Sequence, residues 1–173
     1  MAIRMRVLAG ALAAAMLACL AALTPAAATT EGYVEQAALS DLLAIETARI
    51  ALGRADSDGV REFARQALAD RTETLRWLRE ATAAGQPPVA VPQALDPARA
   101  ALVAQLRDVA GPDFDRRYLD IQIRTGAATV ALHQAYAQGG PVAALRALAE
   151  ESARVVQAHV EHLLMLAGAV QPA

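Results

Sequence analysis

The sequence predicts an all-α protein: an up-and-down four-helix bundle with a proline-rich crossover and one short extra helix. Apolar residues recur at helical spacing through nearly the whole chain, and no strand pattern stands out. Short breaks rich in glycine, aspartate and proline divide the chain into four long segments and one short one. Long helical segments joined by tight turns are typical of a bundle.

The first two long segments are expected to form a hairpin. Residues 33–54 carry the first helical pattern, and the break "ADSDG" that follows offers Ser57 or Asp58 as a helix cap. The second helical pattern covers 59–83. The apolar stripe of this segment consists of Val60, Phe63, Ala67, Leu75 and Leu78.

The stretch "AAGQPPVAVPQALDP" interrupts the helical pattern with four prolines, which remove backbone donors and break helices. Asp96 followed by Pro97 then indicates the start of a short helix that runs to about Val109. Two further long helices are predicted at about 113–138 and 141–167, separated by "QGGP". These two would form the second hairpin, with the proline-rich segment and short helix crossing between the pairs.

The N-terminus has the features of an export signal. Arg4 and Arg6 precede an uncharged run at 7–23, and small residues lead to an expected cut after Ala28. Cleavage would place one domain, residues 29–173, in the periplasm or extracytoplasmic envelope.

Two alternatives to cleavage stay open. The uncharged run of about 17 residues is near the lower limit for a membrane span, so the segment could be retained as an anchor. Cys19 follows "MLA" and could carry a lipid. Membrane contact is expected only if the N-terminal segment is retained.

The charge of the chain excludes one class of partner. All 16 basic residues are arginine, and the formal net charge is −2, so there is no basic field to attract nucleic acid.

Two histidines lie on the predicted inward stripe of the last helix. His159 is near the middle of the stripe, and His162 lies about 60° toward its flank at 100° per residue. Both could face the interior, and histidines three apart can share a metal ion. Glu46 lies on a plausible inward arc of the first helix and is the acid that could complete such a site.

An arginine stands where the second helix should be apolar. Arg71 is at the centre of the stripe, and a buried charge requires a partner. Counted from the turn near Asp56, Glu46 lies within about five residues of the same level, or ~7 Å, so a buried Arg71–Glu46 ion pair is predicted. Asp70 is expected on a solvated face, and His133 at the half-exposed edge of its helix.

Several sequence pieces, taken in order, resemble the ferritin-like exported bacterial family called domain of unknown function 4142. They are "YVEQAALSDLLAIETARIAL", "VREFARQALADRTETLRWL", "FDRRYLD" and "HLLML". The resemblance covers about residues 33–168 and implies a ferritin-like four-helix bundle with a long crossover. It implies no activity, because none is established for the family.

The chain departs from this family at the positions that would bind a metal. Members often carry Asp-His in the second helix, Asp-His in the fourth, and a histidine before Leu-x-Met in the last. Here the first is Asp70-Arg71 and the second is Thr125-Gly126, and only His162 remains of the three. A guanidinium at position 71 would repel a cation, so the comparison argues against a metal site.

The sequence contains no nucleophile motif, phosphate-binding loop or supported pair of carboxylates. We therefore expect no enzyme activity and no cofactor. The leading hypothesis is an exported, non-enzymatic bundle that binds a protein or envelope component. The alternative is a metal-binding ferritin-like protein that uses His159, His162 and Glu46.

Overall fold

The computed structural model describes residues 29–85 and 88–170, and every regular element in these ranges is helical, which confirms the all-α prediction. The predicted signal segment, residues 1–28, lies outside the described residues. The long helices and the short one are α2 (Thr30–Arg54), α3 (Asp58–Ala84), α4 (Pro97–Asp108), α5 (Phe114–Gly139) and α6 (Ala143–Val170). A 3-10 turn, η3 (Gly111–Asp113), precedes α5.

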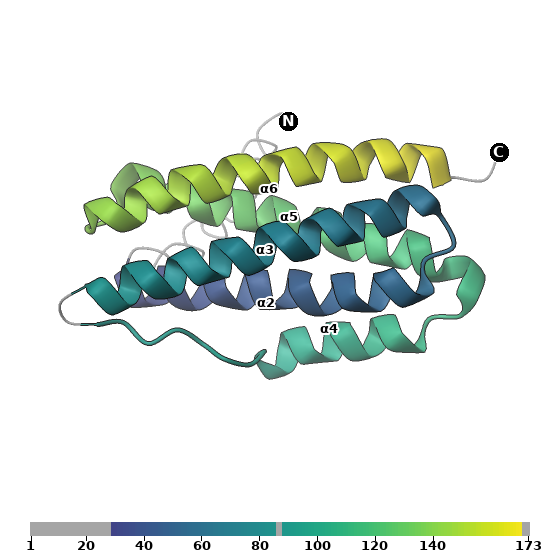
Figure 1. The fold of residues 1–173 in the computed structure, drawn as a ribbon, viewed down its shortest axis with the longest axis horizontal. Coiled ribbons are helices and arrows are strands. Elements are labelled where there is room, and N and C mark those ends of the chain that lie inside the picture. The colour runs from purple at the N-terminus through teal and green to yellow at the C-terminus, as the bar shows by residue number, and fades with distance from the viewer. Residues whose placement is uncertain (1–28, 86–87, 171–173) are drawn as a thin grey trace, which may run out of the picture.

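The four long helices form the bundle, and α4 lies outside it (Figure 1). Helix α2 packs against α3 and α5, while α6 packs against α5 and α3, so α2 and α6 are diagonally opposite. Neighbouring helices of the bundle run antiparallel (Figure 1). The crossover and α4 return the chain along the outside of the bundle, so α3 and α5 run in the same direction (Figure 1).

Three helices begin where the sequence supplies a side-chain cap. Thr29, Ser57 and Asp96 each accept a hydrogen bond from the backbone N–H three residues further on, at the starts of α2, α3 and α4. Pro97 occupies the first turn of α4, where its missing N–H costs nothing. The helix boundaries therefore follow from local sequence.

The interior combines many alanines with large leucine, tyrosine and phenylalanine side chains. Helices α5 and α6 approach closely at Gly126 on α5, where an added Cβ would lie 2.8 Å from Cγ2 of Val160 on α6. No helix in the described ranges combines the length and apolar character that a bilayer span requires.

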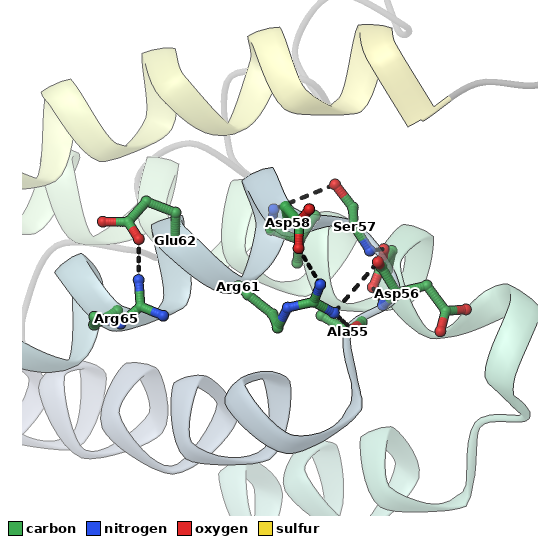
Figure 2. A network of polar contacts seen from close by, with 9 residues as sticks. Ala55, Asp56, Ser57, Asp58, Arg61, Glu62 and Arg65 are labelled. Carbon is green, nitrogen blue, oxygen red and sulfur yellow. Dashed lines mark hydrogen bonds and ion pairs between the residues drawn. The ribbon is translucent and has the colours of Figure 1, made fainter.

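The turn between α2 and α3 is fixed by a buried carboxylate from the start of α5. Asp115 accepts hydrogen bonds from the backbone N–H groups of Asp56 (3.2 Å) and Ser57 (2.8 Å). On the turn itself, Arg61 donates to the carbonyl of Ala55 (Figure 2). Asp115 thus ties the turn of the first hairpin to the start of the second.

Replacing Asp115 with alanine is expected to lower the free energy of unfolding by about 1–3 kcal/mol, because two backbone donors lose their acceptor. Chemical denaturation followed by circular dichroism measures the change. The matched control is Asp113→Ala, which removes a carboxylate that is 58% exposed and should have little effect. Equal effects of the two substitutions would show that Asp115 does not hold the turn.

Candidate functional site

The centre of the bundle contains an arginine and an aspartate that are paired and almost completely buried. Nη1 of Arg71 donates to Oδ1 of Asp41 at 3.2 Å, and the two side chains are 6% and 3% exposed. Thr74, on the same helix as Arg71, donates its hydroxyl to Oδ2 of Asp41 at 2.9 Å. Helices α2 and α3 are therefore joined by three polar side chains inside an otherwise apolar seam.

Burial raises the pKa of Asp41, although the charge of Arg71 and the hydrogen bond from Thr74 act in the opposite direction. The desolvation of two charges thus offsets much of their mutual attraction, as is common for buried ion pairs. Such a pair specifies which helix faces meet more than it stabilises the fold.

The predicted pair between Arg71 and Glu46 is wrong. Glu46 is half-buried and bonds instead to Arg49 on its own helix, at 2.7 Å. Asp41 lies 15 residues before Asp56, and Arg71 lies 15 residues after it, so these two face each other across the hairpin. Glu46 is only 10 residues from that point and occupies a different level of the bundle.

His159 is buried between α6 and α3. Its side chain is 6% exposed, and its Nε2 lies 2.8 Å from Oδ2 of Asp70. Asp70 was expected simply to face solvent. Its side chain is 38% exposed, but its carboxylate reaches across to the last helix.

A phenylalanine packs against both histidines of the last helix. The ring of Phe63 makes T-shaped contacts with His159 and with His162, each with ring centroids 5.5 Å apart. His162 is half-buried, in line with its position on the flank of the stripe. The two imidazoles therefore border the same aromatic side chain at the α3–α6 interface.

Burial lowers the pKa of His159, and the nearby charge of Arg71 lowers it further, while the hydrogen bond that Asp70 accepts opposes both. Burial and the charge of Arg71 thus favour the neutral form of His159. A neutral imidazole beside a carboxylate is held in one orientation, because only one ring nitrogen can make that hydrogen bond.

His133 on α5 is 2% exposed and not half-exposed as expected. Its Nδ1 lies 3.1 Å from the hydroxyl of Tyr33, and the Tyr33 ring stacks on Tyr136 with centroids 3.9 Å apart. Burial and then the charge of Arg71 lower the pKa of His133 to about 3. Tyr33, on the first turn of α2, covers the edge of α5 on which His133 lies, which the sequence analysis expected to be half-exposed.

The three candidate metal ligands are not brought together. His159 and His162 lie on α6, whereas Glu46 lies on the diagonally opposite α2 and is bonded to Arg49. Within residues 29–85 and 88–170, no group of three or more His, Cys, Asp or Glu could hold a metal ion. The positive charge of Arg71 also acts on imidazoles from both α5 and α6. These side chains do not fit a resident metal ion as they stand.

Comparison with known proteins identifies one family and one group of similar folds. The sequence matches the family described as "Domain of unknown function (DUF4142)" over residues 15–166. No curated protein matches it. Among solved structures, CopM in its Cu(II)-bound form has a TM-score of 0.70 and 15% identity, covering 83% of this chain and 98% of that one.

Two other forms of CopM are similar to the same extent. The Cu(I)-bound form has a TM-score of 0.67 and the Ag-bound form 0.64. Each is 17% identical and covers 80% of this chain and 94% of the other. Similarity at this level of identity shows a shared fold.

Proposed function

Because the chain belongs to the DUF4142 family, which is defined without an activity, we propose that it is an exported helical bundle with a non-enzymatic role. In this proposal it is a binding or structural component of the cell envelope, with a protein or envelope component as its partner. The observation that carries the proposal is Arg71, which places a fixed, paired cation at the centre of the bundle.

Three buried or partly buried polar contacts join different helices of the bundle, which supports a scaffold role. Asp41 is bonded to Arg71, His159 to Asp70, and His133 to Tyr33. Polar pairs that connect two helices inside the core help to fix how those helices pack.

Metal analysis of protein purified without a histidine tag tests this proposal. After exposure to buffered Cu(I), Ag(I) or Zn(II) and desalting, we expect substoichiometric metal, because Arg71 disfavours a second cation beside it. Arg71→His removes that charge and adds an imidazole, so it should retain more metal than the unsubstituted chain. Stoichiometric metal in the unsubstituted chain that is lost in His159→Ala/His162→Ala would reject the proposal.

The second candidate is a metal-binding role, which two observations favour. CopM in its copper- and silver-bound forms is among the solved structures with a similar fold. In addition, half-buried His162 is three residues from Met165, a residue that is 68% exposed. An imidazole and a thioether are ligands suited to soft ions such as Cu(I) and Ag(I). Metal retained by His159→Ala but lost in Met165→Leu would assign binding to this surface pair.

Export is tested by the mass of the mature chain. We expect a chain that begins at Thr29, as cleavage after Ala28 would leave. Cleavage there keeps α2 complete, because Thr29 is its N-cap and accepts a hydrogen bond from Gly32. Intact-mass spectrometry of protein recovered from the envelope measures the N-terminus. A mass that includes residues 1–28 would support the anchored alternative, and a lipid adduct on Cys19 the lipidated one.

A further inference from the structure

Helix α4 has little interior contact for a helix of 12 residues. Only Val103 and Leu106 are buried, and the rest of α4 is exposed or half-exposed. Leu106 packs in the core cluster that contains Ala51 of α2 and Phe114 of α5. Helix α4 therefore covers the α2–α5 side of the bundle through two side chains (Figure 1).

The polar contacts that hold α4 are concentrated at its C-terminus. The guanidinium of Arg54, from the end of α2, donates to the carbonyls of Leu106, Arg107 and Val109. Its Cζ also lies 5.0 Å from the centroid of the Phe114 ring. The last carbonyls of a helix have no partner within the helix, so one arginine from the bundle satisfies the end of α4.

The other side-chain contacts of α4 with the bundle involve neutral amides. Arg99 donates to Gln36 at 2.9 Å, and Arg117 donates to Gln105 at 3.1 Å. Among the described residues, no ion pair joins α4 to another helix. Arg54 makes three hydrogen bonds to this end of α4, whereas Arg99 and Arg117 make one each to an amide, so Arg54 is the main polar anchor.

The segment before α4 permits movement. Residues 88–96 have no regular structure, and in the described chain no backbone–backbone hydrogen bond connects them to the bundle. Val89 and Val91 pack against the core, and Arg79 of α3 donates to Gln93 at 3.3 Å. The segment is therefore tied to the bundle as far as Gln93, and movement of α4 would begin after that residue. After α4, the 3-10 turn η3, which contains Pro112, separates α4 from α5.

We infer that α4 is a detachable cover with Arg54 as its latch: it lifts as a unit and exposes apolar surface on α2 and α5 while the four long helices stay folded. Regions with few buried apolar contacts open at a lower free energy than the global transition. This inference is independent of whether the bundle binds a metal or a protein.

Thiol labelling under native conditions tests the inference. Cys19 is the only cysteine of the chain, so Cys19→Ser leaves an introduced thiol as the sole target. Val103→Cys reports on α4, and Val156→Cys, which replaces a 0%-exposed valine on α6, is the matched control. We expect position 103 to react at least ~100-fold faster and with little dependence on urea, since its opening exposes little surface.

The role of Arg54 as a latch is tested by adding Arg54→Ala to each of the two chains that carry an introduced cysteine. Loss of charged hydrogen bonds should speed labelling at position 103 by about 10- to 100-fold without a comparable change at position 156. Arg54→Lys keeps the charge but not the planar fork of the guanidinium. Its labelling rate at position 103 should lie between those of the chains with arginine and with alanine at position 54. Equal acceleration at both positions would make Arg54 a general stabiliser and overturn its role as a latch.

Two results would contradict the inference that α4 detaches while the bundle stays folded. One is labelling at positions 103 and 156 with equal rates and equal urea dependence. The other is amide hydrogen exchange in the unsubstituted chain that protects residues 101–108 as strongly as the centre of α6. This second measurement needs no substitution, so it decides the question even if a variant fails to fold.

Discussion

Replacing Arg71 with methionine is expected to reduce the free energy of unfolding by about 3–5 kcal/mol, the largest effect of any single change proposed for this protein. The substitution leaves the carboxylate of Asp41 buried with only the Thr74 hydroxyl as a partner. Urea denaturation at pH 7 followed by circular dichroism measures the loss. A matched control is Arg65→Met on the same helix, because Arg65 is 61% exposed and its pair with Glu62 should contribute under about 1 kcal/mol.

The double substitution Arg71→Met/Asp41→Asn separates the cost of an unpaired charge from the cost of lost packing. Removing both charges should cost less than the sum of the two single changes, with a coupling of about 1–3 kcal/mol. If Arg71→Met costs no more than Arg65→Met, the ion pair is not formed in solution. Additive effects of the two single changes would lead to the same conclusion.

Acidification is expected to destabilise the protein between pH 6.5 and 3, mainly through His133. Its pKa in the folded state is about 3, whereas it is about 6.5 in the unfolded chain. Between these values the unfolded state binds a proton that the native state does not, so stability is fully present above pH 6.5 and is lost as the pH falls. The loss is on the order of 1.4 kcal/mol per pH unit across this window.

The measurement compares the unsubstituted chain with His133→Gln, which does not titrate and still offers Tyr33 a hydrogen-bond partner. From pH 6.5 to 4.5 the unsubstituted chain should lose about 2–3 kcal/mol more than the variant. The contributions of carboxyl groups largely cancel in this comparison. His159 shifts in the same direction and adds to the slope of both chains. Parallel pH dependences would show that His133 is already protonatable in the folded state.

The helices and their order could be predicted from the sequence because their signals are local. Ser57 and Asp96 cap the helices that the pattern indicated, and the prolines of 86–97 mark the crossover. Spacing also placed His159 at the middle of its stripe and His162 at the flank, where they lie at 5% exposed and half-buried. Each of these depends on the geometry of one helix.

The partners of the polar groups could not be predicted in the same way, because they depend on how two helices meet. Periodicity placed Glu46 on an inward arc but did not distinguish its level from that of Asp41. Counting equal distances from the turn would have selected Asp41. No such count was available for Asp70 and His159, because the crossover, α4 and α5 lie between α3 and α6 in the chain. No tight turn connects these two helices.

The ion pairs of the bundle differ in what they connect. In the part of the chain that the structure describes, Arg71–Asp41 is the one arginine–carboxylate pair that joins two helices, and the others join residues three or four positions apart. Dissolved ions weaken exposed attractions and have little access to the interior. The mutual orientation of the helices should therefore be insensitive to ionic strength.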